Sequence, residues 1–206
     1  MTLESPSHAK LLKACWVTDI LASYNHMDYL GFNFVPTSKR YIDSEKAQLI
    51  LQDMHSKYAS VIPVALFQNH TFWDIQKITQ LTGITTIQLH GDETPDFVRE
   101  LVATWHTCVK ALPYTQRHNR ELYKDCVSLF IFDAPIAWLW LWYDYNILND
   151  VPVECRFLVA WGVTIDNAKN ICETVPHAVG IDVASWVAKD RNIDPYKVEE
   201  LYKMIR

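Results

Sequence analysis

Glycine is the residue that this sequence lacks most clearly. The chain has 206 residues but only 5 glycines, whereas the average usage of about 7% predicts roughly 14. Tryptophan is abundant instead, with 8 copies. No GxGxxG or P-loop motif is present. Their absence gives no support to a nucleotide-binding, doubly wound open sheet, which is the structural alternative to the fold argued below.

Paired cysteines and an excess of basic residues are also missing. The 5 cysteines are an odd number and form no CxxC pair, so neither a zinc site nor a disulfide framework is indicated. Reduced thiols in a cytoplasmic protein are the better interpretation. The polar first ten residues contain no apolar signal core, which fits the same compartment. The net charge of −5 argues against a protein that binds nucleic acid.

No apolar run is long enough to cross a membrane. The most aromatic stretch, AWLWLWY at residues 137–143, lies between Asp133 and Asp144. That is far short of the ~20 apolar residues that a spanning helix needs. An amphipathic patch that rests on a membrane surface is the open alternative for this stretch.

Short apolar segments do recur along the whole chain. They are rich in Val, Ile, Leu and Phe and mostly lack strict alternation. This is typical of strands that are covered on both faces in a parallel sheet. The segments are residues 11–17, 28–34, 61–67, 85–90, 107–112, 128–134, 156–161 and 178–184.

Segments with helical spacing lie between these strands. Residues 43–57 begin with two capping side chains, and residues 164–175 have a similar start. Residues 94–104 and 194–205 place proline at the first helical position. The count is eight strands alternating with about eight helices. It predicts one domain, residues 1–206, folded as an α/β protein of the (β/α)8 TIM-barrel class.

In such a barrel the chemistry lies at the C-terminal ends of the strands. Those ends carry several polar or reactive residues here. They are Cys15, the segment 36–40 ending in Arg40, His90, Lys110, Asp133, Gly162, Asp182 and Ser185.

These residues stand in motifs that resemble the phosphoribosylanthranilate isomerase family of tryptophan biosynthesis. LGFNFVPTSKRYID (30–43) is similar to that family's strand-two pattern, and IQLHGDETPDFV (87–98) to its strand-four motif. VKAL, FIFDA, WGVTIDNA and GIDVAS follow in the expected order. Each motif alone is weak, but six in register are specific, and they cover nearly the whole chain.

The resemblance implies an Amadori rearrangement, in which an aminoaldose phosphate becomes an aminoketose without a metal ion or a cofactor. It implies Asp133 as the general acid and Cys15 as the general base. From its position alone Cys15 reads as a small buried hydrophobe. The resemblance implies that Arg40 holds the carboxylate of the anthranilate, for which its planar fork is suited. Without the resemblance, Arg40 reads as a solvated surface residue.

The other site residues have roles that are open to a second interpretation. His90 lines the pocket or is a hydrogen-bonded core histidine. Asp182 binds sugar hydroxyls or accepts a backbone hydrogen bond. Gly162 and Ser185 would donate backbone N–H groups to the substrate phosphate, as loops after strands seven and eight often do in this fold. Asp92 and Glu93 are most simply partners of a helix dipole, and Lys110 packs or pairs in the barrel mouth.

Tryptophan replaces glycine at several positions of the resembling motifs. Where the family has KICGIT, AGGL and DVSSGVE, this chain has KACWVT, AWGV and DVASWVA, with Trp16, Trp161 and Trp186 in place of glycine. Trp138 and Trp140 fall in the family's glycine-rich loop after strand six. Two interpretations stay open: the indoles fill the phosphate site, or UGA codons read as glycine in the cell appear here as tryptophan.

The sequence therefore predicts a cytoplasmic isomerase of a small phosphorylated substrate, as a monomer or homodimer. It predicts no partnership with nucleic acid or membrane. A catalytically inactive barrel that binds a ligand is the alternative if the tryptophans are present. An isomerase that acts on a related aminoaldose phosphate is a third reading, which changes only the partner of Arg40.

Overall fold

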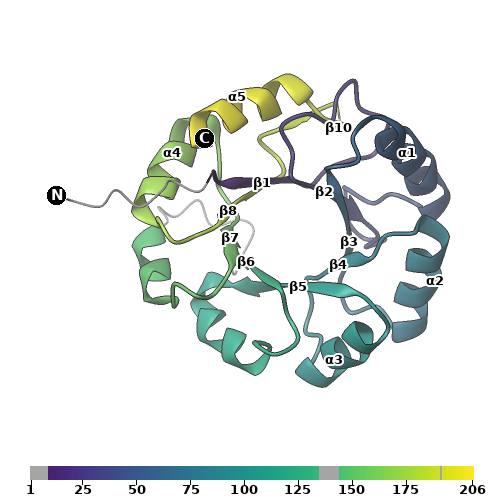
Figure 1. Cartoon of the computed structure of the whole chain (residues 1–206), viewed down its shortest axis with the longest axis horizontal. Coiled ribbons are helices and arrows are strands. Elements are labelled where there is room, and N and C mark those ends of the chain that lie inside the picture. The colour runs from purple at the N-terminus through teal and green to yellow at the C-terminus, as the bar shows by residue number, and fades with distance from the viewer. Residues whose placement is uncertain (1–8, 135–143, 191) are drawn as a thin grey trace.

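The apolar segments of the chain form one closed parallel barrel. The computed structural model describes residues 9–134, 144–190 and 192–206. Eight strands pair in chain order, and β1 pairs with β8 to close the ring (Figure 1). The strands are β1 Leu11–Ala14, β2 Tyr29–Asn33, β3 Ile62–Phe67, β4 Thr86–Leu89, β5 Thr107–Pro113, β6 Leu129–Asp133, β7 Phe157–Val159 and β8 Gly180–Val183.

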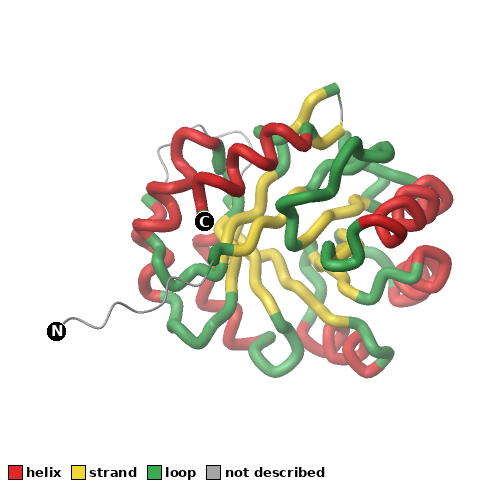
Figure 2. The backbone as a smooth tube through the Cα atoms, turned by 45° about the horizontal axis from the view of Figure 1, so that its top comes forward, coloured by secondary structure: helices red, strands yellow, loops and turns green. Residues whose placement is uncertain are grey.

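This ring confirms the predicted (β/α)8 class and excludes the doubly wound open sheet. The strands are buried on both faces, as their continuous apolar runs predict. Figure 2 shows the strands in the centre with the helices around them. The helices are α1 Ser44–Lys57, α2 Phe72–Thr82, α3 Pro95–Ala103, α4 Ile165–Thr174 and α5 Pro195–Ile205.

Local capping explains where the helices begin. The Asp43 carboxylate accepts a hydrogen bond from the backbone N–H of Lys46 at 2.7 Å and starts α1. Thr94 accepts from Phe97 N–H at the start of α3, where Pro95 takes the first helical position. At α4 the Asn167 side chain accepts from Thr164 N–H at 2.8 Å. The four helices predicted from capping and spacing are confirmed to within one residue at each end.

The expected count of about eight helices is wrong for the described residues. The β5–β6 connection is a 3₁₀ segment, η1 Tyr114–Leu122, and the β6–β7 connection ends in another, η2 Tyr145–Asp150. Residues 114–122, YTQRHNREL, carry too few apolar side chains to bury a helix face on the barrel. No described helix joins β1 to β2, and after β8 a short hairpin, β9 Ala188–Lys189 with β10 Asn192–Ile193, precedes α5.

The described residues form three buried apolar clusters, the smallest of which contains only Cys15, Val35 and Leu66, and the two others hold the barrel together. The larger one lies between the strands and the helices, and the smaller one fills the barrel from β5, β6 and β7. Leu11 packs against the smaller cluster. Because side chains alternate along a strand, Leu11, Lys13 and Cys15 share the inward face of β1. The N-terminal half of β1 thus closes the barrel floor, and its C-terminal end points Cys15 toward the mouth.

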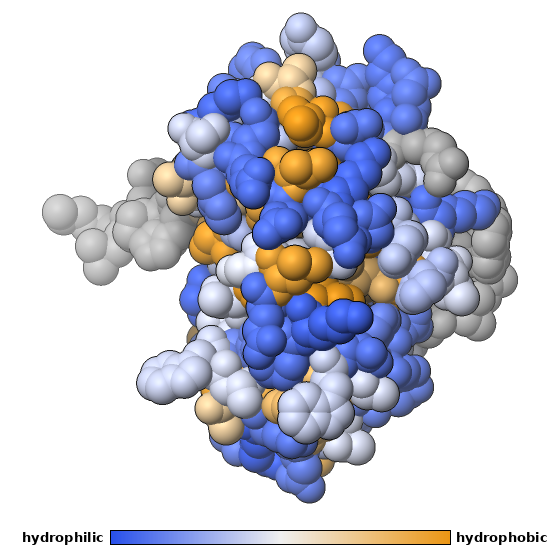
Figure 3. Space-filling model, turned by 90° about the vertical axis from the view of Figure 1, so that its right-hand side faces the viewer, coloured by the Kyte–Doolittle hydropathy of each residue, from blue (hydrophilic) through white to orange (hydrophobic). Residues whose placement is uncertain are grey.

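The outer surface is mainly hydrophilic. Figure 3 views the side that carries α1 and α2, where isolated apolar side chains are separated by hydrophilic ones. Leu49 of α1 and Trp73 of α2 are exposed apolar residues. In the part of the chain that the structure describes, no helix is both long enough and apolar enough to span a membrane.

Candidate active site

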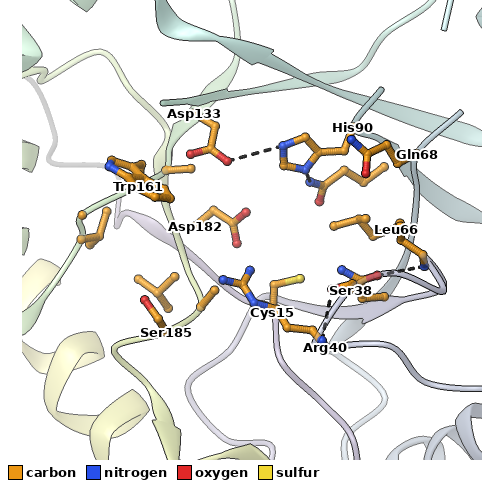
Figure 4. Close-up of a pocket in the computed structure, with 18 of the residues that line it drawn as sticks. Cys15, Ser38, Arg40, Leu66, Gln68, His90, Asp133, Trp161, Asp182 and Ser185 are labelled. Carbon is orange, nitrogen blue, oxygen red and sulfur yellow. Dashed lines mark hydrogen bonds and ion pairs between the residues drawn. The ribbon is translucent and has the colours of Figure 1, made fainter. Parts of the chain in front are cut away.

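A cavity of about 690 Å³ opens at the C-terminal ends of the barrel strands. Every site residue that the sequence predicts lines this cavity, although they come from six different strand ends and loops (Figure 4). The predicted residues are Cys15, Arg40, His90, Asp133, Gly162, Asp182 and Ser185. Asn33, Ser38, Gln68 and Gln88 add polar groups to the wall.

Cys15 follows β1 directly and lies at the base of the cavity. It is 3% exposed, and its backbone N–H donates to Val183 O of β8 at 2.9 Å. A Cβ at Gly31 would approach the Cys15 sulfur to 2.6 Å, so glycine in β2 makes room for the thiol. Burial raises the pKa of Cys15, and the Lys13 ammonium is the strongest influence that opposes this rise.

Asp133 ends β6 and faces His90, which follows β4. Asp133 Oδ2 lies 3.5 Å from His90 Nε2, while Asp133 Oδ1 accepts from Ala134 N–H at 2.7 Å. Gln88 Nε2 lies 3.4 Å from His90 Nδ1. With the Gln88 amide in this orientation it donates to Nδ1, which leaves Nε2 as the ring nitrogen that faces Asp133 with a proton. His90 therefore lines the pocket, and the core alternative does not apply.

Arg40 extends over the cavity from the loop after β2. The loop turns through a hydrogen bond from Ser38 N–H to Val35 O at 2.9 Å, and Ser38 Oγ accepts from Arg40 N–H at 3.1 Å. The Arg40 guanidinium carbon lies 4.7 Å from the centre of the Trp16 ring, a cation–π distance. Within the described residues no carboxylate forms a salt bridge with Arg40. The guanidinium is thus available to an anionic ligand.

Asp182 forms a buried ion pair with Lys13 on the neighbouring strand. Lys13 Nζ lies 2.9 and 3.0 Å from the two Asp182 oxygens. The two residues are register partners of β1 and β8. Burial by itself would lower the pKa of Lys13, but the Asp182 carboxylate raises it overall, so the ammonium stays charged. The suggested backbone hydrogen bond to Asp182 is replaced by this ion pair.

The loops after β7 and β8 form a wall of free backbone donors. In the part of the chain that the structure describes, no acceptor takes the N–H of Gly162, Val163 or Ser185. Gly162 has a φ of 65°, and Trp161 before it has a φ of 70°. Asn167 Nδ2 donates to Gly162 O at 2.7 Å, which turns this carbonyl toward α4 and away from the donors. Clustered N–H groups of this kind suit an anion.

The tryptophans of the motifs occupy different places. Trp161 lines the cavity at the donor wall, whereas Trp16 and Trp186 are not part of its lining. Trp16 stacks with Arg40, and its Nε1 is buried without a hydrogen-bond partner. Lys197 Nζ lies 5.4 Å from the Trp186 ring centre and donates to Trp186 O. Trp138 and Trp140 lie outside the described residues. Of the three that the structure describes, only Trp161 fits the reading in which an indole covers the phosphate site.

The expectation for Glu93 is wrong. Its carboxylate does not simply face a helix start, since it is buried and paired with Lys110 at 3.0 Å. It also accepts from the backbone N–H groups of Asn69 at 2.9 Å and Gly91 at 3.0 Å. This network joins the β3–α2 and β4–α3 loops to β5 and fixes the backbone beside His90. The expected pairing of Lys110 in the barrel mouth is confirmed.

Two further polar residues belong to the site in addition to those predicted from the sequence. Gln88 orients His90, and Lys13 pairs with Asp182. A signal for Lys13 was present, because a charged residue within the apolar strand LLKACW needs a buried partner. The described residues contain no cluster of three or more His, Cys, Asp or Glu side chains suited to a metal ion.

Comparison with known proteins identifies relatives along nearly the whole chain. The model of the N-(5'phosphoribosyl)anthranilate (PRA) isomerase family matches residues 12–204. The N-(5'-phosphoribosyl)anthranilate isomerase of Staphylococcus haemolyticus is 29% identical over 188 residues, which cover 88% of this chain and 89% of that protein. The enzyme of the same name from Bacillus cereus strain B4264 is 29% identical and covers 92% of this chain and 94% of its own length.

Solved structures share the fold. Phosphoribosyl anthranilate isomerase from Thermotoga maritima superposes with a TM-score of 0.82 at 22% identity, over 95% of this chain and 98% of that chain. A phosphoribosyl anthranilate isomerase in complex with reduced 1-(o-carboxyphenylamino)-1-deoxyribulose 5-phosphate superposes with a TM-score of 0.81 at 20% identity, over the same shares of both chains.

Proposed function

The chain belongs to the N-(5'-phosphoribosyl)anthranilate isomerase family, and on this basis we propose that it converts N-(5'-phosphoribosyl)anthranilate into the carboxyphenylamino-deoxyribulose phosphate of tryptophan biosynthesis. One observation carries the proposal for this chain's own residues. Cys15 and Asp133 line one cavity from β1 and β6, and the Arg40 guanidinium and the free N–H groups of Gly162 and Ser185 line it as well.

The first step opens the sugar ring. Asp133 donates a proton to the furanose ring oxygen, the C1–O bond breaks, and the nitrogen lone pair forms the C1=N bond of a protonated Schiff base. His90 lies 3.5 Å from Asp133 on the same wall and holds the carboxyl group toward the cavity. This step needs one acid and no other reagent.

The second step removes the proton from C2. The Cys15 thiolate takes it, the C–H electron pair forms a C1=C2 bond, and the nitrogen becomes neutral. The resulting enol tautomerises to the C2 ketone, with a proton added at C1. Cys15 is able to reach a substrate from below because it lies at the cavity base, while Asp133 acts from the opposite wall.

Binding energy comes from the two ends of the substrate. We assign the anthranilate carboxylate to Arg40, whose fork donates two parallel hydrogen bonds. The phosphate is assigned to the N–H groups of Gly162, Val163 and Ser185, which no acceptor in the described chain takes. The ion pair with Lys13 does not use all the lone pairs of the Asp182 carboxylate. Asp182 would therefore also accept a hydrogen bond from a ribose hydroxyl.

Asp133→Asn tests the proposal directly. The purified protein is mixed with N-(5'-phosphoribosyl)anthranilate and the aminoketose product is measured. We expect turnover in the unmodified chain and a loss of about 10²–10⁴-fold in Asp133→Asn, the range of a general acid. Asp96→Asn is the control, because Asp96 is exposed on α3. Absence of turnover in the unmodified chain contradicts the proposal.

Trp161 favours a second candidate, a barrel that binds a ligand without turnover. Its indole lines the donor wall where the phosphate is assigned. Trp161→Gly discriminates the two, with the affinity for inorganic phosphate and the turnover measured side by side. An isomerase whose donors are partly covered gains both affinity and turnover. A non-catalytic barrel gains affinity alone.

Membership of the family also suggests the compartment, the ligand and the assembly state. We assign it to the cytoplasm, with a small phosphorylated molecule as the ligand and a monomer or homodimer as the assembly. Among the relatives, the Thermotoga maritima isomerase is described as dimeric, and monomers of it are described as well, which supports leaving both states in the assignment.

A further inference from the structure

Lys13 is a buried lysine that the reaction scheme leaves without a role. It is 1% exposed and lies in β1, two residues before Cys15 on the same inward face. Its ammonium contacts both oxygens of Asp182 at 2.9 and 3.0 Å. A buried ion pair is weak evidence for a stability role, since well-packed apolar residues often replace one without loss. A role in the cavity therefore needs to be considered.

Four charged side chains influence Cys15 electrostatically. Lys13 comes from β1, Asp182 from β8, Arg40 from the loop after β2 and Asp133 from β6. Apolar groups lie beside Cys15 as well: Val35 and Leu66 belong to the same buried cluster, and a Cβ at Gly31 would approach the sulfur to 2.6 Å.

The pKa of Cys15 reflects this surrounding. Burial raises it most, Lys13 lowers it, Asp182 raises it, Arg40 lowers it and Asp133 raises it. Of the two residues in the ion pair, the cation has the larger influence. A thiolate in this buried position is thus favoured by two cations, Lys13 and Arg40, and Lys13 is the one that lies in β1 on the same inward face as Cys15.

We propose that Lys13 is a positioning residue of the isomerisation. Its ammonium holds the Asp182 carboxylate at the cavity wall and supplies the positive charge that allows Cys15 to act as a thiolate. This inference rests on the proposed function, because it needs Cys15 to be the base. It adds a residue to the site whose contribution acts through Cys15 and Asp182 rather than through contact with the substrate.

Cys15 alkylation by iodoacetamide tests the inference without substrate. The rate is followed against pH on the peptide that contains Cys15, by mass spectrometry. We expect Lys13→Met to move the profile to higher pH and to slow alkylation at neutral pH at least tenfold. Lys13→Arg keeps the charge and should keep the profile. An unchanged profile in Lys13→Met overturns the inference.

Circular dichroism and thermal unfolding show whether each variant is folded. Two more variants test the inference in case Lys13→Met does not fold. Asp182→Asn removes the carboxylate but leaves the cation, so the profile should move to lower pH. Lys13→Met/Asp182→Asn removes both charges and should move it upward, though less than Lys13→Met. Movement of either variant in the opposite direction overturns the inference.

The kinetics separate this inference from the proposed function. With the phosphoribosyl substrate, Lys13→Met should lower kcat and shift the pH–rate profile upward, with little change in KM. The unmodified chain could show no turnover while Lys13→Met still shifts the alkylation profile. That result would refute the proposed function and leave the inference standing. If the chain is active but Lys13→Met leaves the pH profile of Cys15 alkylation unchanged, only the inference is refuted.

A second inference rests on the backbone of two tryptophans. Trp105 has a φ of 71° and Trp161 a φ of 70°, a left-handed conformation that costs a residue with a Cβ roughly 1–2 kcal/mol. Trp105 follows the C-cap of α3, where glycine is the usual residue. Gly83, which ends α2 as its C-cap, has a similar φ of 72°. Trp105 is 92% exposed, so burial of its indole does not offset the strain.

We infer that positions 105 and 161 carry glycine in the protein made by its native host, through a UGA codon read as glycine. At position 105 the backbone supports this independently of the family motifs, which do not include that position. The other described non-glycine residues with positive φ are His26, Asn69 and Asp190, residue types that are enriched in this conformation, unlike tryptophan. Peptide mapping of protein isolated from the native source tests it. Glycine at both positions is the expected result, and tryptophan at either one overturns the inference.

Discussion

His90 Nε2 lies 3.5 Å from Asp133 Oδ2 at the mouth of the barrel. This relationship gives the proposed acid a fixed neighbour, and Gln88 and the Glu93 network hold that neighbour in place. The acid thus has a defined orientation before substrate arrives, which is the condition for efficient proton donation.

His90→Ala should lower kcat without removing activity. The variant loses the side chain that orients Asp133 but leaves the carboxyl group itself, and a partly exposed pair at 3.5 Å is worth about 0–1 kcal/mol. We expect a decrease of roughly tenfold or less, measured by steady-state kinetics. His118→Ala, in an exposed histidine of η1, is the control. A loss as large as that of Asp133→Asn would show that His90 itself transfers a proton.

Cys15→Ser should reduce turnover by about 10²–10⁴-fold, since a hydroxyl is a far weaker base than a thiolate. The pH dependence gives a sharper test. The base acts when deprotonated, and burial raises the pKa of Cys15, so kcat/KM should still be rising above neutral pH. A kcat/KM that is flat from pH 6 to 9 would exclude Cys15 as the base. Cys172→Ala, on α4 away from the cavity, is the matched control.

Arg40→Lys should raise KM and leave kcat nearly unchanged. Lysine keeps the charge but loses the planar fork that binds a carboxylate through two hydrogen bonds. Hydrogen bonds to charged groups contribute about 1.5–3 kcal/mol, so we expect KM to rise by roughly 10- to 100-fold. Lys39→Ala, in the exposed neighbour, serves as the control. Equal KM values in Arg40→Lys and the unmodified chain would support the third reading, in which the substrate carries no anthranilate carboxylate.

Much of this site could be predicted from the sequence, because the order of the strands and the places where they end determine which residues line it. In a closed parallel barrel the residue after each strand faces one mouth. Recognising FIFDA as a strand therefore placed Asp133, and recognising LLKACW placed Cys15. The capped helices were predictable for a similarly local reason, since Asp43 and Thr94 act within four residues.

The features that sequence reasoning missed are long-range. Lys13 pairs with Asp182, 169 residues away, and Glu93 reaches Lys110 and Asn69 from another loop. The lysine within LLKACW indicates a buried partner but does not say which residue that partner is, and nothing in the local pattern distinguishes Glu93 from a solvated charge. The 3₁₀ connections were missed because alternation with helices was assumed after every strand, although residues 114–122 lack an apolar face.

Buried thiols should make the protein less stable at alkaline pH. Burial raises the pKa of Cys108 to about 12, whereas an unfolded cysteine ionises near ~8.5. Above that pH the unfolded chain loses a proton that the folded chain keeps, so the free energy of unfolding falls as pH rises. Urea unfolding at pH 7 and pH 10 measures this. Cys108→Ala should show a smaller decrease between the two values, and an equal decrease would assign the effect to other groups.

Two exposed tryptophans form a matched pair for backbone strain. Trp105 is 92% exposed with a φ of 71°, and Trp73 is 77% exposed within α2. Trp105→Gly relieves the strain of the left-handed backbone but also gives the unfolded chain more conformational freedom. We expect a net increase in the free energy of unfolding of about 0.5–1 kcal/mol. Trp73→Gly weakens a helix and should lower it by up to about 1 kcal/mol. Urea unfolding measures the free energy of unfolding of both variants. A lower value in Trp105→Gly than in the unmodified chain would mean that the turn after α3 carries no strain, and it would remove the argument for glycine at position 105.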